Sequence, residues 1–294
     1  MKFAKVIVFL LFYPIFIAGN HLVDLIVFSY NRGTQLYATI ESSRKYFAGL
    51  NDIYVLYRAS DDKYKMPYLD IKNTFDVKLV RQGSNPRADF KPLFINILKQ
   101  SKASYVLLAV DDIFVKDFVD LSNCAQHLER YNAYAFYLRL GKNINYCYSC
   151  KIQSPPPSMK EVFTGVFEWV FNSSLGDWGY PNSVDMTIFR KKDVLRDAQQ
   201  FNFTAPNIFE GQWAAFGARR ILDRTGLCFE TSKIVNVPAN LVQQSHKNNP
   251  HMNSMSPRFL LQKYYEGYKI NINKFFRMNN NSPHYEVAFD FIKR

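Results

Sequence analysis

The chain has 294 residues, of which 48% are hydrophobic and 21% charged, so it can bury a large core and is too apolar to be disordered as a whole. Its net charge of +12 favours an acidic partner, such as nucleotide phosphates or an anionic membrane surface. The basic residues are scattered, with no arginine-rich block and no zinc-finger spacing, so the composition argues against nucleic acid as a partner.

The first nineteen residues have the pattern of a targeting segment. Lys2 and Lys5 precede an apolar run from Val6 to Ala18, and this resembles a secretory signal peptide or a short signal-anchor. The run is shorter than the roughly 20 residues that a membrane-spanning helix needs. We therefore expect residues 1–19 to be a signal peptide or signal-anchor, and the protein to be membrane-associated through this segment or exported.

The first half of the mature chain alternates between strand and helix patterns. Leu22 to Tyr30 predicts a strand, Asn31 to Thr34 a turn with helix-capping residues, and Leu36, Ile40 and Phe47 one face of a helix. The elements expected next are a strand over Ile53–Tyr57, a polar loop over Arg58–Lys65, a strand over Val77–Val80 and a helix over Phe90–Leu98. This alternation predicts an α/β fold with a mainly parallel sheet and right-handed crossovers.

The fourth predicted strand carries the most informative motif. The segment from Tyr105 to Phe114 reads YVLLAVDDIF, an apolar run that ends in Asp111 and Asp112. Ligands bind beyond the carboxyl ends of strands in open α/β sheets, and two carboxylates there would suit Mg²⁺ or Mn²⁺. The alternative is a solvated strand end that precedes a helix cap at Asp117.

The second half is less regular and predicts a mixed sheet. The expected elements are a helix through Phe118, Leu121, Cys124 and Leu128, strands over Ala133–Leu140 and Val166–Phe171, a turn and strand over Tyr180–Arg190, and a helix over Pro206–Phe216. The tail after Pro250 is rich in Asn, Tyr and Lys, which predicts a partly disordered or membrane-facing extension.

Two of the four cysteines, Cys147 and Cys150, form a single CxxC. One such pair supplies only half of a structural zinc site. The pattern predicts a loop disulfide if the protein is exported and two free thiols if it is not.

Four segments together resemble the nucleotide-sugar glycosyltransferases of the GT-A fold, and glycosyltransferase family 2 in particular. They read VFSYNRGTQLYATIES, LLAVDDIF, YPNSVDMTIF and APNIFEGQW, and the resemblance covers roughly Leu22 to Pro250. It implies one GT-A-like (Rossmann-like) domain over residues 20–250 with a mixed, mainly parallel central sheet, and a C-terminal extension over residues 251–294 packed in part on it. It also implies non-processive transfer of a sugar from a nucleoside diphosphate donor to a glycan or lipid-linked acceptor, with Mn²⁺ or Mg²⁺ as the cofactor.

The resemblance assigns roles to particular residues. The donor base and ribose would meet Ser29, Tyr30, Asn31 and Arg32, with Asp61 on the base. Asp111 would face the ribose or the metal, Asp112 would ligate the metal that bridges the diphosphate, and His246 would complete the metal shell. Val110 stands where many relatives carry another Asp, so the metal motif is minimal.

An inverting transfer needs a base to deprotonate the acceptor hydroxyl. Glu210 is the first candidate for this base, and Asp185 in the YPNSVD turn is the second. For Glu210 the alternative is an acid placed at a helix N-terminus, and for His246 an exposed loop histidine. Arg139 and Lys142 could contact the diphosphate, and Trp169, Trp178 and Trp213 could stack on an acceptor sugar, with solvation and core packing as the respective alternatives.

Two other functions compete with glycosyl transfer. A nucleotidyltransferase on a related fold is disfavoured because Asn31 to Thr34 lacks the glycines that let the backbone approach a triphosphate. A degenerate, non-catalytic module that binds glycans or an anionic surface fits Val110 and the net charge of +12.

Overall fold

The computed structural model describes residues 22–242, 252 and 255–294. The predicted targeting segment and His246 lie outside these ranges, so both remain sequence-based predictions. No helix within the described ranges has both the length and the hydropathy that crossing a membrane requires.

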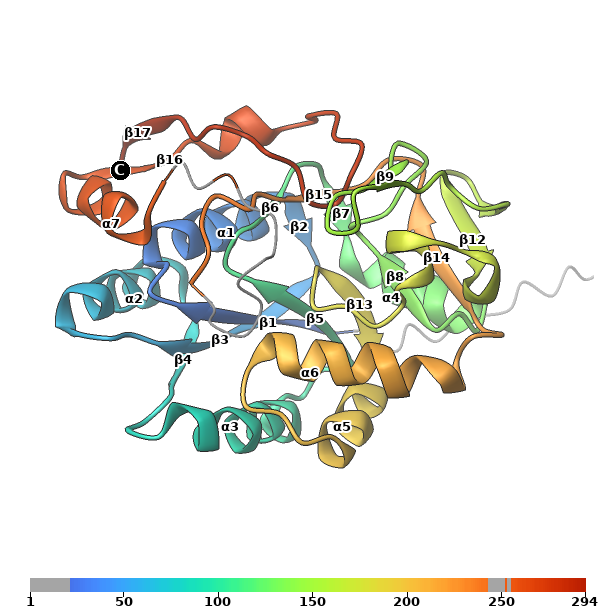
Figure 1. Cartoon of the computed structure of the whole chain (residues 1–294), viewed down its shortest axis with the longest axis horizontal. Helices are drawn as coiled ribbons and strands as arrows, with labels where there is room; N and C mark the ends of the chain where they lie inside the picture. The colour runs from blue at the N-terminus through green and yellow to red at the C-terminus, as the bar shows by residue number, and fades with distance from the viewer. Residues whose placement is uncertain (1–21, 243–251, 253–254) are drawn as a thin grey trace, which may run out of the picture.

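A nine-stranded sheet forms the centre of the molecule (Figure 1). In sheet order its strands are β11 (Lys160–Phe163), β12 (Val166–Val170), β14 (Thr225–Phe229), β8 (Ala135–Tyr137), β13 (Thr187–Arg190), β5 (Tyr105–Val110), β1 (Val23–Tyr30), β3 (Leu50–Arg58) and β4 (Lys78–Arg81). All of them run in the same direction except β12 and β13, which are antiparallel to their neighbours. The predicted mixed, mainly parallel sheet is therefore confirmed.

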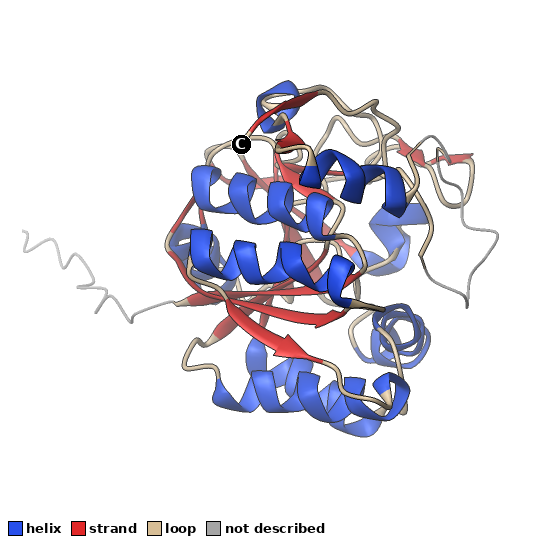
Figure 2. Cartoon of the chain, turned by 90° about the vertical axis from the view of Figure 1, so that its left-hand side faces the viewer, coloured by secondary structure: helices blue, strands red, loops and turns tan. Residues whose placement is uncertain are grey.

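Helices cover both faces of the sheet (Figure 2). Because side chains of a strand alternate between faces, Leu25 and Val27 of β1 join one core, and Ile26 and Phe28 join the other. The first core includes side chains of α1 (Gly33–Tyr46), α2 (Asp62–Phe75), α4 (Leu121–Arg130) and α7 (Pro257–Tyr265). The second includes side chains of α3 (Pro86–Gln100), α5 (Lys191–Gln200) and α6 (Pro206–Gln212).

The order of the parallel strands creates a switch point. β1 lies between β3 and β5 and is parallel to both, so the chain leaves β1 toward one side of the sheet and later returns on the other. In open α/β sheets ligands bind beyond the strand ends at such a point. Residues 29–32 and the carboxylate pair at 111–112 lie at these two ends.

Shorter elements surround this sheet. Four two-stranded pairs are β6 (Ile113–Val115) with β15 (Ile234–Asn236), β9 (Tyr146–Cys147) with β10 (Ile152–Gln153), β2 (Phe47–Ala48) with β7 (Val119–Asp120), and β16 (Tyr268–Ile270) with β17 (Phe291–Lys293). Short helical turns are η1 (Phe171–Ser173), η2 (Gly176–Gly179), η3 (Trp213–Gly217), η4 (Ala218–Arg220) and η5 (Ile272–Phe275).

The C-terminal residues 255–294 pack on the first core. Leu260, Ile270 and Phe275 are buried there, and the Thr34 hydroxyl at the start of α1 donates to the Leu260 carbonyl at 2.9 Å. Lys269 of β16 pairs with Glu41 of α1. The described part of the tail is thus ordered, and the prediction of disorder is wrong for it, because its apolar side chains have a surface to cover.

Three local predictions need correction. The expected loop over Arg58–Lys65 instead contains the start of α2, which Asp61 caps by accepting from the Tyr64 amide at 3.1 Å. Phe118 is not in the predicted helix, because α4 begins at Leu121 after the cap residue Asp120, and Phe118 is exposed. The strand predicted over Ala133–Leu140 is only as long as β8, and α5 was not predicted.

Candidate active site

The carboxylate pair at the end of β5 is buried. Asp111 is 3% exposed and Asp112 is 7% exposed, which excludes a solvated strand end. The same alternative predicted a helix cap at Asp117. Asp117 instead accepts from the adjacent Phe118 amide at 2.9 Å and pairs with Lys233. Buried carboxylates require compensating charge or hydrogen bonds.

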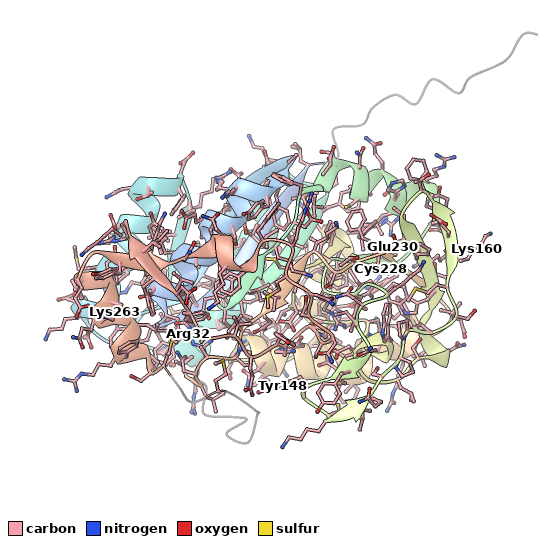
Figure 3. All side chains as sticks on the ribbon, turned by 90° about the horizontal axis from the view of Figure 1, so that it is seen from above. Arg32, Tyr148, Lys160, Cys228, Glu230 and Lys263 are labelled. Carbon is pink, nitrogen blue, oxygen red and sulfur yellow. The ribbon has the colours of Figure 1, made fainter. Side chains whose placement is uncertain are left out.

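Arg32 supplies that charge. It is the second residue after β1, and its Nη1 lies 3.1 Å from Asp111 Oδ1 and 2.8 Å from Asp112 Oδ2. Its Nε donates to Asn240 Oδ1 at 2.8 Å, and its Nη2 donates to the Asn240 carbonyl. Seen from above, Arg32 lies on the side of the molecule that carries Lys263, away from Lys160 (Figure 3). The sequence predicted Arg32 at the donor site, but not its ion pair with the two carboxylates.

Asp111 is also bound to the end of β1. The Ser29 hydroxyl donates to Asp111 Oδ2 at 2.7 Å, the Tyr30 amide donates to the same oxygen at 3.3 Å, and Ser29 also bonds the Tyr68 hydroxyl at 2.8 Å. Both oxygens of Asp111 therefore have partners. Asp112 Oδ1, by contrast, is buried and has no hydrogen-bond partner among the described residues. An unsatisfied buried carboxylate oxygen is costly, so this atom is a candidate for contact with a ligand or cation.

Glu210 approaches the same region from α6. Its Oε1 accepts from the Ser183 hydroxyl at 2.8 Å and from the Val184 amide at 2.9 Å. Withdrawal of this carboxyl group from water, together with the nearby charge of Asp185, raises the pKa of Glu210 to about 7. A carboxylate with such a pKa can exchange a proton near neutral pH.

Asp185 faces a histidine that sequence reasoning missed. Asp185 Oδ2 lies 3.6 Å from His284 Nε2, and Asp185 Oδ1 accepts from Asn236 Nδ2 at 3.4 Å. The His284 ring stacks on the Tyr148 ring at a centroid distance of 6.4 Å. The only signal in the sequence was a histidine late in the chain. Its contact with Asp185 could not be read from local sequence, because the two residues are 99 positions apart.

The site carries excess negative charge. Arg32 pairs with Asp111 and Asp112, Asp185 acts on both Asp112 and Glu210, and Arg139 is the nearby cation of Glu210. Burial raises the pKa of Asp111 and of Asp112, and Arg32 opposes this in both cases. Asp185 further raises the pKa of Asp112 and of Glu210. An additional cation would relieve this repulsion.

The site offers few protein ligands to a divalent cation. Across residues 22–242, 252 and 255–294, no group of three or more His, Cys, Asp or Glu side chains could hold a metal ion. The remaining acceptor of the pair is Asp112 Oδ1. This matches the way Mg²⁺ is commonly held, by one or two carboxylates with substrate phosphates and water as the other ligands.

The ends of β1 and β3 form the rim of the site. The Asn31 side chain donates to the Ser60 hydroxyl at 3.0 Å and accepts from the Ser60 amide at 2.9 Å. The Arg58 guanidinium lies over the Tyr30 ring, 4.9 Å from its centroid. Asp61 follows Ser60 and is exposed; its Oδ1 caps α2, and its Oδ2 accepts from the Ser60 hydroxyl at 3.1 Å.

Other candidate residues have structural partners. Arg139 is buried, where its Nη1 lies 2.9 Å from Asp177 Oδ1 and its Nη2 donates to the Tyr180 carbonyl at 2.6 Å. Lys142 pairs with Glu230 at 3.5 Å. The three tryptophans, Trp169, Trp178 and Trp213, are all at most 2% exposed and belong to the second core, so packing accounts for them.

The cysteines are unlinked. All four, Cys124, Cys147, Cys150 and Cys228, are free thiols in the structure. Of the two alternatives for the CxxC pair, the structure therefore has the free thiols.

No protein-family model matches the chain. Among curated proteins, the chain is 27% identical over 191 residues to the bifunctional glycosyltransferase pgtA of Dictyostelium discoideum, and the match covers 58% of this chain and 24% of that protein. The chain thus resembles a glycosyltransferase in sequence and spans about a quarter of the length of this relative.

Several solved structures are similar at low identity. A UDP complex of TarS from S. aureus is 17% identical, with 71% of this chain and 58% of that chain covered and a TM-score of 0.47. The mannosyltransferase PcManGT from Pyrobaculum calidifontis, in complex with GDP-Man and Mn²⁺, is 12% identical, with 70% and 53% covered and a TM-score of 0.42. The 4-diphosphocytidyl-2C-methyl-D-erythritol synthase from Anaerococcus prevotii is 12% identical, with 84% and 97% covered and a TM-score of 0.40.

Proposed function

We propose that the protein is a glycosyltransferase that moves a sugar from a nucleoside diphosphate donor to a glycan or lipid-linked acceptor. The observation that carries this proposal is a buried carboxylate pair at the switch point of the sheet, with Asp185 acting on both Asp112 and a further acid, Glu210, whose pKa is raised to about 7. The sequence similarity to a glycosyltransferase supports the reaction class.

The donor nucleotide would lie against the ends of β1 and β3. Tyr30 and Asn31 form the rim there and offer an aromatic face and an amide, and Asp61 stands beside them at the start of α2. Ser29 and Arg32 would act indirectly, because their polar atoms already hold the carboxylate pair.

A divalent cation, Mn²⁺ or Mg²⁺, would bind through Asp112 and the donor diphosphate. When bound, it would supply Lewis-acid stabilisation of the charge that grows on the leaving phosphate. Asp111 would position Arg32 and the strand ends rather than ligate the ion, since both of its oxygens are already bonded. His246, outside the described residues, stays a candidate for an additional ligand.

Glu210 would accept the proton of the acceptor hydroxyl. Its hydrogen bonds to Ser183 and Val184 fix one oxygen, Oε1, and leave Oε2 to receive a proton. Asp185 is the second candidate, and its Oδ2 lies 3.6 Å from His284 Nε2.

The Asp112→Asn variant tests the proposal. Wild type should gain thermal stability from Mn²⁺ with UDP or GDP, because a ligand that binds only the folded state stabilises it. Asp112→Asn should lose that gain and remain folded, and its stability without ligand should hold or rise because like-charge repulsion falls. Asp193→Asn, a carboxylate change on α5, is the matched control and should respond as wild type does.

A direct assay completes the test. Release of nucleoside diphosphate from a panel of nucleotide sugars should require Mn²⁺ or Mg²⁺ in wild type and fail in Asp112→Asn. If Asp112→Asn gains as much stability from Mn²⁺ and nucleotide as wild type, the doublet is not the donor site and the proposal is rejected.

The cellular setting is a separate proposal. We infer from Lys2, Lys5 and the apolar run that follows them that residues 1–19 direct the protein to a membrane or through it. Fractionation of cells that produce the full chain and a chain lacking residues 1–19 tests this, and identical fractionation of the two would contradict it.

A further inference from the structure

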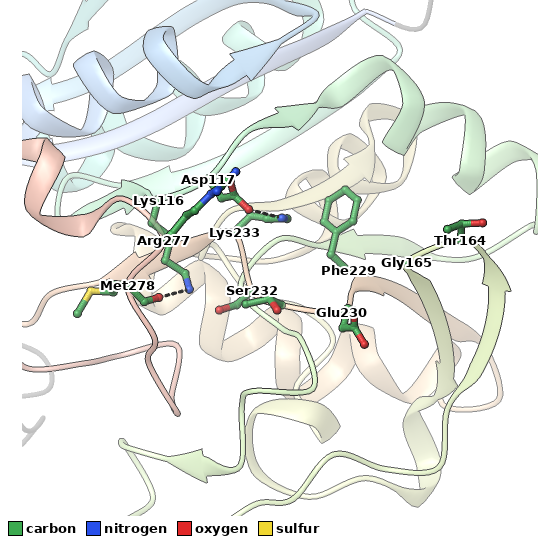
Figure 4. A pocket seen from close by; sticks show the side chains of 11 residues that line it. Lys116, Asp117, Thr164, Gly165, Phe229, Glu230, Ser232, Lys233, Arg277 and Met278 are labelled. Carbon is green, nitrogen blue, oxygen red and sulfur yellow. Dashed lines mark hydrogen bonds and ion pairs between the residues drawn. The ribbon is translucent and has the colours of Figure 1, made fainter.

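A polar cavity lies at the end of the β6–β15 strand pair that is remote from Asp112. β6 begins directly after Asp112 and ends before Lys116, and it pairs with β15, which follows Lys233. One end of this ladder therefore faces the candidate active site, where Asn236 contacts Asp185. The other end opens into a cavity of about 450 Å³ lined by Lys116, Lys233 and Arg277 (Figure 4).

Lys116 is the central feature of this cavity. It is 1% exposed, and its Nζ donates to the Met278 carbonyl at 2.7 Å. Within the part of the chain that the structure describes, Lys116 forms no salt bridge with Asp117, which pairs with Lys233 and Arg277 instead. Burial and the nearby charge of Lys233 lower the pKa of Lys116 to about 8. A buried ammonium with this environment is short of negative charge.

The other charges of the cavity do not remove that shortage. Asp117 is shared between two cations, with Lys233 Nζ at 2.5 Å from its Oδ2 and Arg277 Nε at 3.5 Å from its Oδ1. Glu230, the other acid on the lining, pairs with Lys142. Three cations thus face one shared carboxylate, and the hydroxyls of Thr164 and Thr231 add further donors to the lining.

The backbone holds this arrangement in place. The Lys116 amide donates to the Lys233 carbonyl at 2.9 Å, and the Arg277 amide donates to the Lys116 carbonyl at 2.7 Å. Arg277 has a φ of 54°, a left-handed conformation that is uncommon for a residue other than glycine. Donors that converge from three separate segments suit a tetrahedral oxyanion, which accepts hydrogen bonds in several directions.

We propose that the cavity of Lys116, Lys233 and Arg277 binds a phosphate group, and that this group belongs to a ligand other than the donor nucleotide. Asp112 and Lys116 are four positions apart along an extended strand, which corresponds to about 13 Å. The cavity is therefore distinct from the carboxylate doublet, yet one extended acceptor could reach both. The ligand is a phosphorylated acceptor or a free phosphate.

Calorimetric titration of the full chain with inorganic phosphate tests the site, and titration with chloride at matched ionic strength is the reference. Wild type should bind phosphate saturably. Lys116→Met should remain folded, because a methionine fills the space of the lysine stem and removes a buried charge, and it should bind phosphate at least tenfold more weakly. Lys233→Met should show the same loss of phosphate binding, and it replaces Lys116→Met as the test variant if Lys116→Met does not fold.

Three further variants sharpen the result. Asp117→Asn should bind phosphate more tightly, because it removes the carboxylate that competes for Lys233 and Arg277. Lys192→Met, a change of an exposed cation on α5 outside the lining, and Asp112→Asn should bind as wild type does. Tighter binding of glycerol phosphate than of inorganic phosphate would indicate a phosphorylated acceptor, and equal binding a free phosphate. Unchanged phosphate binding in both Lys116→Met and Lys233→Met, or no saturable binding in wild type, would overturn the proposal.

Discussion

The contacts of Arg32 are the decisive feature at the scale of single residues. One guanidinium joins the end of β1, both carboxylates after β5 and Asn240 from a segment more than 200 residues later. A buried ion pair contributes little net stability, since desolvation offsets its attraction, but the loss of one partner leaves buried charge uncompensated. Arg32 is therefore needed less for its own attraction than to keep the doublet ionised and in place.

Arg32→Met should destabilise the protein by about 3–5 kcal/mol, the usual cost of removing one partner of a buried ion pair. Urea unfolding followed by circular dichroism measures this cost. The triple variant Arg32→Met, Asp111→Asn, Asp112→Asn should recover most of the loss, because no buried charge remains unpaired. Arg58→Met, which changes an exposed arginine at the end of β3, is the control. An equal loss in the single and triple variants would show that Arg32 stabilises by packing alone.

Glu210→Gln should reduce turnover by roughly 10²–10⁴-fold and leave donor affinity nearly unchanged, because a base acts on the acceptor in the transition state. Steady-state kinetics and calorimetric titration with nucleotide measure the two quantities. In wild type, turnover should rise with pH through about 7, where Glu210 ionises, and the variant should lack this limb. Wild-type turnover in Glu210→Gln would move the base assignment to Asp185.

Glu210 should also affect the dependence of stability on pH. Its folded pKa is raised above the unfolded value, so the folded state binds the extra proton, and this stabilisation is present at low pH and is lost as pH rises through about 7. Glu210→Gln cannot ionise, so its melting temperature should exceed that of wild type at pH 8 and match it near pH 4. A difference in melting temperature that does not change with pH would contradict the raised pKa.

Local sequence predicted some of these residues and could not predict others. The apolar run of β5 located Asp111 and Asp112, because a strand end is a local property. The burial of the two carboxylates and their pairing with Arg32 depend on β1 and β5 lying side by side, a contact between residues 79 apart. His284 lay beyond local reasoning, because it reaches Asp185 only after the chain has folded back over the sheet.

At the scale of elements, α2 shows where sequence patterns misled. The polar residues after β3 predicted a loop, but a helix that contains Pro67 forms there. The helix forms nevertheless, because Asp61 caps it and Tyr68 and Ile71 are fully buried in the first core. Tertiary burial thus outweighed weak local preference, whereas β1, β3 and α3 were predicted because their apolar patterns are strong.

The two possible roles of Asp61 can be separated. Asp61→Ala should cost about 0.5–2 kcal/mol, because the N-cap hydrogen bond to Tyr64 is lost, whereas Asp61→Asn should retain stability, since asparagine caps equally well. If the carboxylate also binds the donor base, Asp61→Asn should weaken nucleotide binding without affecting stability. Thermal melting and calorimetric titration of both variants measure these effects. Unchanged nucleotide binding in Asp61→Asn would restrict Asp61 to the cap.

At the scale of the whole molecule, the two ends of the chain are expected to behave differently. The first sheet strand begins at Val23, after the predicted targeting segment. The C-terminal residues 255–294 instead cover α1 and contribute His284 to the candidate active site. The sequence pattern alone could not show this packing, because Leu260, Ile270 and Phe275 are scattered among polar residues and become buried only against a distant helix.

Deletion of residues 1–19 should leave a folded domain that unfolds cooperatively, whereas deletion of residues 255–294 should prevent folding. The second deletion exposes the surface covered by five large buried side chains, Leu260, Tyr264, Ile270, Phe275 and Phe289. At about 1.5–3 kcal/mol for each, this burial amounts to roughly 10 kcal/mol, which is comparable to the whole stability of a typical protein. Differential scanning calorimetry of the two truncated chains provides the measurement. Cooperative unfolding after the C-terminal deletion would show that the sheet and its helices are stable without the extension, and loss of cooperativity after the N-terminal deletion would show that residues 1–19 belong to the core.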